Sequence, residues 1–310
     1  MRRTRLGTSS TTLSIVGLGC DKMYPGAREA EFAANIAYAL DSGVTVFDTA
    51  AIYGNGSNEE FLGRALRGRR HQAFICTKFG HLVQADGRPG GGGRPEHVAV
   101  SCEQSLRRLG TDVIDLFCQH LYDPITPVED TVGALARLVE QGKIRHLGLS
   151  NVPPENVRRA HAVHPIAAVQ SEYSLWLRQA EAELLPTCKE LGITFLAYWP
   201  LAQGLLAGRI KTALDLEKDE HRALTIRGNV SGLSLASDLR RLAAVDAIAK
   251  QRGCTPAQIA LAWILAGDYG VVPIPGTKDR AHLAENIAAA NIRLTADEIS
   301  ALNAALPGPR

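Results

Sequence analysis

Apolar positions recur at helical spacing in several parts of the chain. Residues 126–142 show apolar side chains three or four positions apart, followed by a glycine. This stretch opens with Thr126, Pro127 and Glu129, a pattern typical of a capped helix with proline at its first position. The sequence therefore predicts an amphipathic helix here. The same start recurs at Thr255, and further apolar stripes cover residues 32–40 and 98–109.

Short runs rich in β-branched residues separate the helical stretches. They lie at residues 15–18, 44–47, 73–77, 113–118, 144–149, 167–169, 193–197 and 271–274. Several are apolar on both faces, which is typical of parallel strands covered by helices. Strand and helix alternate without a linker, so we predict one α/β domain over residues 1–310. Eight such units favour a (β/α)8 TIM barrel over two smaller domains.

Three further segments complete the predicted layout. Residues 2–15 alternate in polarity around a break at Gly7, which predicts an N-terminal β-hairpin at the bottom of the barrel. Residues 80–93 and 209–235 are long, polar and rich in glycine or charge. Both follow predicted strands, so we expect loops over one face of the barrel.

The composition is that of an ordinary globular protein. Of 310 residues 45% are hydrophobic, and 34 Lys and Arg face 32 Asp and Glu, a net charge of +2. This balance, with no basic stripe along the chain, gives no general attraction for nucleic acid or an anionic membrane. The apolar run 259–266 is far shorter than the ~20 residues that span a bilayer. We therefore expect neither nucleic acid nor a membrane as a partner.

The cysteines are widely spaced. No two of the six are closer than 16 residues, so the chain has no CxxC motif. We predict reduced, mostly buried thiols that bind no metal, and a protein of the reducing cytoplasm. These cysteines are Cys20, Cys76, Cys102, Cys118, Cys188 and Cys254.

Polar residues interrupt the apolar pattern where the predicted strands end. Asp48, Lys78 and His120 end the second, third and fourth strands, each with the parity of an apolar column before it. Further polar residues at strand ends are Asn151, Gln170 and Tyr198. Taken singly, each is typical of a solvated loop. Together they mark the barrel face on which active sites are built.

Tyr53 lies five residues beyond Asp48, in the adjoining loop. A lysine near a tyrosine favours the phenolate and lowers its pKa, and an aspartate keeps that lysine charged and aimed. Such a tyrosine is a plausible general acid for a carbonyl oxygen.

Over essentially its whole length the sequence resembles the aldo-keto reductase superfamily. The resemblance is carried by Phe47-Asp48-Thr49-Ala50 through Tyr53-Gly54, Thr77-Lys78-Phe79-Gly80, Gln119-His120 with Asp123-Pro124, Gly148-Leu149-Ser150-Asn151, Gln170-Ser171-Glu172-Tyr173, and Pro275-Gly276-Thr277 with Glu285-Asn286. It implies a catalytic tetrad of Asp48, Tyr53, Lys78 and His120, with Tyr53 as proton donor and His120 orienting the carbonyl.

The resemblance also implies a nicotinamide dinucleotide, NADPH or NADP+, across the barrel mouth. No Rossmann G-x-G-x-x-G motif is present, since Glu59 stands where the third glycine would follow Gly54 and Gly56. The implied coenzyme contacts are Ser150, Asn151 and Gln170 to the carboxamide, Tyr198 on the ring, Pro200 and Leu201, and then Gly276, Thr277, Lys278, Arg280, His282, Glu285 and Asn286. Gly276 and Thr277 are expected to begin a helix whose amide groups bind a phosphate.

Two residues depart from the family pattern. Trp199 stands where many members have serine, and His282 stands where an arginine often binds the adenosine 2′-phosphate. A largely neutral histidine is a weaker phosphate partner. The sequence therefore favours NADPH and leaves NADH open.

The leading hypothesis is reduction of an aldehyde or ketone to an alcohol. An alternative is a cofactor-binding interaction protein like the potassium-channel β subunits of the same superfamily, since a fold does not guarantee turnover. A lyase or isomerase is a third alternative, disfavoured because the sequence has no clear metal-ligand cluster. The candidate substrate pocket comprises Met23, Tyr24, residues 79–82 with Phe79, Tyr122, Trp176 and residues 209–235. The sequence indicates neither the substrate nor the oligomeric state.

Overall fold

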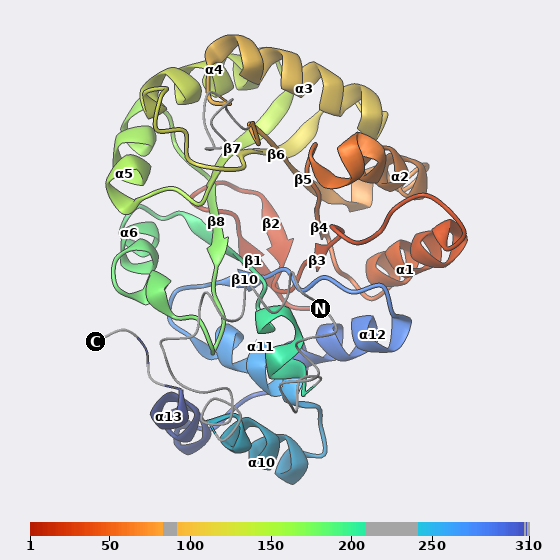
Figure 1. Cartoon of the computed structure of the whole chain (residues 1–310), viewed down its shortest axis with the longest axis vertical. Coiled ribbons are helices and arrows are strands. Elements are labelled where there is room, and N and C mark those ends of the chain that lie inside the picture. The colour runs from red at the N-terminus through yellow and green to blue at the C-terminus, as the bar shows by residue number, and fades with distance from the viewer. Residues whose placement is uncertain (83–91, 209–240, 307, 309–310) are drawn as a thin grey trace.

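Eight parallel strands, adjacent in space in chain order, form the centre of the protein (Figure 1). The computed structural model describes residues 1–82, 92–208, 241–306 and 308. The strands are β3 (Leu18–Gly19), β4 (Val46–Asp48), β5 (Phe74–Phe79), β6 (Ile114–Gln119), β7 (Ile144–Ser150), β8 (Ala168–Glu172), β9 (Thr194–Tyr198) and β10 (Val272–Pro273). A parallel bridge between Gly19 and Gly276 and a 2.9 Å bond from Gly17 N to Pro273 O join the last strand to the first. The predicted (β/α)8 fold is confirmed.

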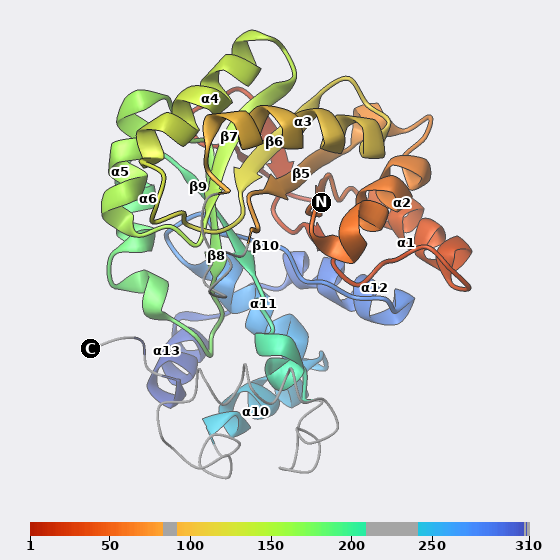
Figure 2. The ribbon, with the colours of Figure 1, turned by 45° about the horizontal axis from the view of Figure 1, so that its top comes forward.

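Helices lie outside the strands, as Figures 1 and 2 show. They are α1 (Glu29–Asp41), α2 (Ser57–Ala65), α3 (Pro95–Leu109), α4 (Val128–Glu140), α5 (Pro154–Val163), α6 (Leu184–Glu190), α10 (Ala243–Arg252), α11 (Pro256–Ala266), α12 (Arg280–Ala288) and α13 (Ala296–Ala305). The apolar stripes predicted from the sequence face the sheet, as with Phe32, Ile36 and Leu40 of α1. This packing fixes the strands whose ends carry the candidate site.

The predicted N-terminal hairpin is confirmed. Strands β1 (Arg3–Arg5) and β2 (Thr12–Ser14) pair antiparallel. Leu6 and Leu13 are fully buried and join the apolar cluster inside the barrel. Gly7 N donates a 2.7 Å hydrogen bond to Thr194 Oγ1 at the start of β9. The hairpin therefore closes the end of the barrel where the strands begin.

Inward-facing apolar side chains fill the barrel below the strand ends. The inner cluster contains Val46, Phe74, Cys76, Leu116 and Cys118. Asp48, Lys78 and His120 continue these columns, since side chains alternate along each strand. All six cysteines are free thiols, and five are buried. The parity prediction and the prediction of unpaired thiols are both confirmed.

Two predicted helix starts have different outcomes. At α11, Thr255 and Gln258 form a capping box with Pro256 at the first position, as predicted. At α4, the residue before the helix is Pro127, in an extended conformation, and no side chain caps the helix. Thr126 Oγ1 is buried without a hydrogen-bond partner. The predicted cap at Thr126 is wrong because Pro127 stays extended and moves the helix start one residue along.

Some predictions fall beyond the described residues. Residues 83–91 of the predicted loop 80–93, and all of residues 209–235, lie outside them. Within the part of the chain that is described, no helix is both long and apolar enough to cross a membrane.

Gly148 of β7 has no room for a side chain. A Cβ at this position would overlap Cys118 Sγ inside the barrel. We expect Gly148→Ala to lower the free energy of unfolding by about 1–3 kcal/mol, because overpacking forces the strands apart. Urea denaturation measures this loss.

The same exchange at Gly133 of α4 is the control, because a Cβ there meets only Arg137 Nη1, at 3.9 Å. Gly133→Ala should stabilise the protein by up to about 1 kcal/mol. Adding Cys118→Ala to Gly148→Ala should recover part of the loss. Equal effects at Gly148 and Gly133 would contradict the packing argument.

Candidate active site

A buried ion pair joins the ends of β4 and β5. Lys78 Nζ lies 2.7 Å from Asp48 Oδ2 and donates a 2.8 Å hydrogen bond to Thr49 O. The Lys78 side chain is 0% exposed. Asp48 Oδ1 accepts a 2.8 Å bond from Gln170 Nε2. Each carboxylate oxygen thus has a partner, which a buried charge requires.

Lys78 remains an ammonium in this setting. Burial by itself lowers the pKa of Lys78, but the charge of Asp48 and its hydrogen bond outweigh burial and raise it above the ordinary value. The site therefore holds a fixed positive charge at the centre of the strand ends.

Tyr53 lies over this charge. It opens a 3-10 turn (Tyr53–Gly56) between β4 and α2, and its ring centroid is 5.1 Å from Lys78 Nζ. The turn needs left-handed backbone, with φ of 55° at Gly54 and 56° at Asn55. A Cβ on Gly54 would meet the Tyr24 ring at 2.6 Å, so glycine is required there for space as well.

The pKa of Tyr53 is raised to about 12. Burial is the largest cause, and Asp48 and Asp21 also raise it, while Lys78 lowers it. The sequence predicted the lowering by Lys78, and that effect is present, but burial outweighs it. The phenol consequently carries its proton at neutral pH.

His120 follows β6 and faces Tyr53. The two rings are edge to face, with centroids 5.9 Å apart. Burial, then the charges of Lys78 and His81, lowers the pKa of His120 to about 3. Its Nδ1 is buried without a partner. The imidazole is therefore neutral at physiological pH, when one ring nitrogen donates a hydrogen bond and the other accepts one.

We expect His120 to make stability fall with acidification. Between its unfolded pKa of about 6.5 and its folded pKa of about 3, only the unfolded chain binds the proton. Stability therefore rises with pH in this window, by up to about 1.4 kcal/mol per pH unit. His120→Gln should flatten this slope, measured by urea denaturation across the window.

Above pH 6.5, about the unfolded pKa, the difference in unfolding free energy between wild type and His120→Gln should become constant. If that difference were the same at every pH, His120 would not be the group responsible.

A second cluster of polar side chains lies at the ends of β7, β8 and β9. Asn151 Nδ2 donates to His120 O (3.2 Å) and Ser150 Oγ (3.1 Å), and Tyr198 OH donates to Asn151 Oδ1 (2.9 Å). Gln170 Nε2 is used by Asp48. Within the described residues, Gln170 bonds through Nε2 and Ser150 Oγ accepts from Asn151, so Gln170 Oε1 and the Ser150 hydroxyl hydrogen have no protein partner. One acceptor and one donor are what a carboxamide requires, so this cluster fits a nicotinamide.

The segment after β9 is left-handed at several non-glycine residues. The φ angles are 47° at Trp199, 45° at Ala202 and 53° at Gln203. Pro200 and Leu201 lie between them. Gln203 Nε2 is buried without a partner. Such backbone strain clusters at ligand-binding sites. The coenzyme contacts expected at Pro200 and Leu201 stay a prediction.

Helix α12 starts later than predicted. It begins at Arg280, and Asp279 caps it by accepting from Ala281 N (2.8 Å) and His282 N (3.1 Å). Gly276 and Thr277 therefore precede the helix. The helix start is set by the Asp279 carboxylate, which bonds the first amide groups of α12. The first amide groups of α12 are thus already bonded to a carboxylate.

The predicted phosphate-binding residues have different surroundings. Arg280 turns toward α1, donating to Asn35 Oδ1 (2.7 Å) and Ala34 O (2.6 Å) over the Tyr38 ring. Lys278 is exposed. The structure thus leaves Lys278 available to a phosphate and engages Arg280 in packing. The last three expected coenzyme contacts lie in α12. His282 and Glu285 are half-buried there, and Asn286 is buried.

The predicted pocket residues that the structure describes differ in burial and in what they pack against. Tyr24 is 40% exposed beside the turn that holds Tyr53. Phe79 is buried and stacks on Phe117 at 4.7 Å, because its parity is opposite to that of Lys78 and turns it toward the helices. Met23 is fully buried in the same apolar cluster as Phe79. Tyr122 and Trp176 are half-buried and pack against that cluster.

The sequence interpretation missed Asp21. This carboxyl group is mostly buried beyond β3, and burial, followed by Asp48, raises its pKa against the lowering effect of Lys22 and Lys78. Asp21 is another polar residue just past a strand end, so the rule that found Asp48 could have found it. Thr49, which acts through its backbone carbonyl, gives no side-chain signal.

Two glycines bring the ends of the segment after β5 together. A Cβ on Gly92 would overlap Gly80 O, and Gly80 itself has a φ of 81°. Gly93 is then held by Asp123 Oδ2, which accepts from its N at 2.9 Å, and by Thr131 Oγ1, which donates to its O at 2.7 Å. Gly80 and Gly92 therefore lie in contact next to the anchored Gly93.

Comparison with known proteins agrees with this geometry. The model of the Aldo/keto reductase family matches residues 18–307. The thermostable aldo-keto reductase Tm1743, solved with the inhibitor epalrestat, is 31% identical with a TM-score of 0.78, over 98% of this chain and 100% of that chain.

Two structures of an aldo-keto reductase from Klebsiella pneumoniae are 30% identical to this chain. One, in complex with NADP and acetate, has a TM-score of 0.78, and the other, in complex with NADPH, has a TM-score of 0.79. Each match covers 100% of this chain and 97% of the other. This chain belongs to the aldo/keto reductase family.

Proposed function

We propose that this protein is an NADP(H)-dependent reductase that converts an aldehyde or ketone to an alcohol, with Tyr53 as general acid. The observation that carries the proposal is the buried Lys78–Asp48 pair beneath a protonated phenol and a neutral imidazole. All four groups stand at the carboxyl ends of neighbouring strands, where barrel enzymes place their chemistry.

The roles follow from the charges. The coenzyme, when bound, supplies the hydride. Tyr53 gives its proton to the carbonyl oxygen, and the Lys78 ammonium stabilises the phenolate that remains. Asp48 and Thr49 O hold Lys78 in place. The neutral His120 donates a hydrogen bond that orients the carbonyl.

We propose NADPH as the preferred coenzyme, with NADH as a weaker one. The free acceptor on Gln170 and the free donor on Ser150 suit its carboxamide, and the exposed Lys278 suits a phosphate. The related Klebsiella pneumoniae structures carry NADP and NADPH, which supports the preference. His282 in place of an arginine reduces the discrimination between the two coenzymes.

The partner we propose is thus a small carbonyl or alcohol compound. We place the protein in the cytoplasm, since its six cysteines are unpaired thiols of the kind that a reducing compartment preserves.

The test is consumption of reduced coenzyme by the purified protein, followed by absorbance across a panel of aldehydes and ketones, with NADPH and then NADH. We expect turnover of at least one panel member and a higher kcat/KM with NADPH. Tight NADPH binding without turnover of any panel member would instead favour a coenzyme-binding interaction protein.

A further inference from the structure

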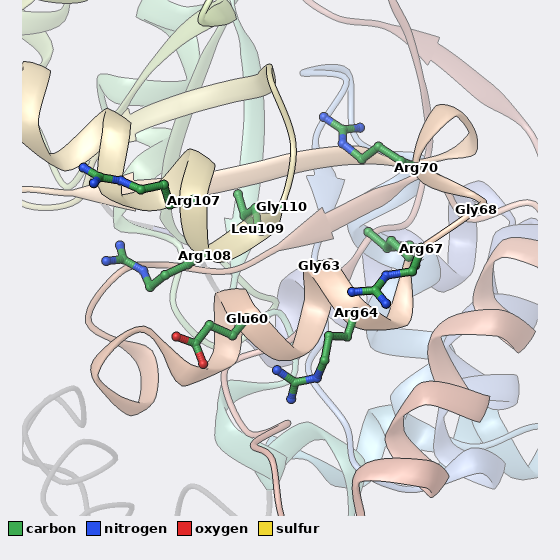
Figure 3. Close-up of a pocket in the computed structure, with 11 residues that line it drawn as sticks. Glu60, Gly63, Arg64, Arg67, Gly68, Arg70, Arg107, Arg108, Leu109 and Gly110 are labelled. Carbon is green, nitrogen blue, oxygen red and sulfur yellow. The ribbon is translucent and has the colours of Figure 1, made fainter.

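A concave site lies away from the strand ends just described. A groove of about 520 Å³ runs between α2 and α3 (Figure 3). Its residues Arg70 and Gly110 shortly precede β5 and β6, so they lie near the amino ends of strands whose carboxyl ends carry Lys78 and His120. The groove is therefore on the flank of the barrel, separate from the candidate active site.

Close contact between the two helices forms the floor of the groove. A Cβ on Gly63 of α2 would overlap the Leu109 carbonyl oxygen of α3. Because glycine lets the helices approach at this point, the long side chains on either side project past the contact. These are Arg64 and Glu60 from α2, Arg67 and Arg70 beyond the end of α2, and Arg107 and Arg108 from α3 (Figure 3).

The groove thus concentrates positive charge in a nearly neutral chain. In the sequence these arginines fall in two separate segments, so no basic stripe is visible, and helix packing brings them together. Five guanidinium groups and one carboxylate line the groove. Such local excess charge raises the concentration of anions at a surface.

Ion pairs orient three of the five arginines. Arg64 pairs with Glu29 at 2.7 Å, Arg70 with Asp115 at 2.7 Å, and Arg108 with Glu59 at 2.6 Å. These pairs hold the walls of the groove but neutralise much of their own charge.

Arg67 and Arg107 are the two that remain for a ligand. Both are exposed, and neither forms an ion pair with any residue in the described ranges. Arg107 Nε donates only to the backbone oxygen of Glu103, at 3.2 Å. Arg67 lies in the turn after α2 and Arg107 lies in α3, so an anion that uses both must present more than one charged group.

We propose that this groove binds an oligophosphate, a small molecule with two or more linked phosphoryl groups. The planar guanidinium fork matches phosphate oxygens in pairs, which a lysine cannot do. The volume lies within the roughly 300–1,000 Å³ of small-molecule sites. A nucleic acid would need a longer basic surface than the two unpaired arginines supply.

The experiment is isothermal titration calorimetry with inorganic tripolyphosphate and, in parallel, ATP. Saturating NADP+ is present so that the proposed coenzyme site is blocked. We expect wild type to bind tripolyphosphate, and the double variant Arg67→Gln/Arg107→Gln to bind it at least tenfold more weakly. If ATP binds with an affinity similar to that of tripolyphosphate, the groove recognises the phosphate chain. If ATP binds more tightly, the groove recognises the nucleoside together with the phosphate chain.

Arg137→Gln is the matched control, because Arg137 is also an exposed arginine in the last turn of a helix, α4. It should bind like wild type, and thermal denaturation checks that all three proteins are folded. Equal binding by the three proteins, or no binding by wild type, would overturn the proposal. The proposal would also be overturned if a short DNA duplex bound through Arg67 and Arg107 and tripolyphosphate did not bind. The comparison of variants stands even if the proposed reductase activity fails.

Discussion

Tyr53→Phe is expected to lower kcat for NADPH-dependent carbonyl reduction by about 10²- to 10⁴-fold, the usual contribution of a general acid. The ring stays, so its contact with His120 and its position over Lys78 should persist. Only the proton donor is lost. The KM for NADPH should therefore be unchanged, and steady-state kinetics with the best substrate of the panel provide the measurement.

Tyr198→Phe is a suitable control for this prediction. It also removes one hydroxyl, the one that donates to Asn151 Oδ1, but from a residue placed to contact the coenzyme rather than the carbonyl. We expect its main effect on KM for NADPH. If Tyr53→Phe kept wild-type kcat, the assignment of Tyr53 as the acid would be abandoned.

Lys78→Met is expected to cost both stability and activity. It leaves the Asp48 carboxylate buried with Gln170 as its remaining side-chain partner. Removing one member of a buried ion pair costs about 3–5 kcal/mol, because the other charge stays in a poorly solvating interior. Urea denaturation measures this loss, and kcat should fall together with it because the phenolate of Tyr53 loses its stabilising charge.

The double variant Asp48→Asn/Lys78→Met separates the two effects. With no charge left to bury, much of the stability should return while activity stays low. Lys143→Met is the matched control at the exposed pair with Glu103, where a loss of about 0–1 kcal/mol is expected. A double variant as unstable as Lys78→Met would show that the buried carboxylate is not the source of the cost.

Much of the fold follows from local patterns in the sequence. Eight apolar runs at regular intervals required eight strands, and polar residues just past them marked the functional face. Side-chain parity along a strand is set by the backbone, so it correctly placed Asp48, Lys78 and His120 above the inner columns. Side-chain parity also places Phe79 on the face of β5 opposite to Lys78. In the structure Phe79 lies on that face, packed against Phe117.

Other features depend on partners far away in the chain. The pKa of Tyr53 is decided by burial, which no local pattern measures. Arg280 is one of the predicted phosphate-binding residues, yet its guanidinium packs on α1, more than 200 positions earlier in the chain. The arginine groove arises because Gly63 lets α2 meet α3. The absence of a cap at Thr126 depends on the conformation of Pro127, which the sequence motif alone does not fix.

The contact between Gly80 and Gly92 bears on how much change in chain length the fold can tolerate at this point. Because the two ends meet at one point, whatever length of chain joins them imposes little extra closure entropy on the fold. His81 must be kept in any such change, because its ring lies 5.4 Å from the His120 ring, centroid to centroid. With His81 and both glycines retained, a change in the length of the chain between them should leave β5 and the Lys78–Asp48 pair in register.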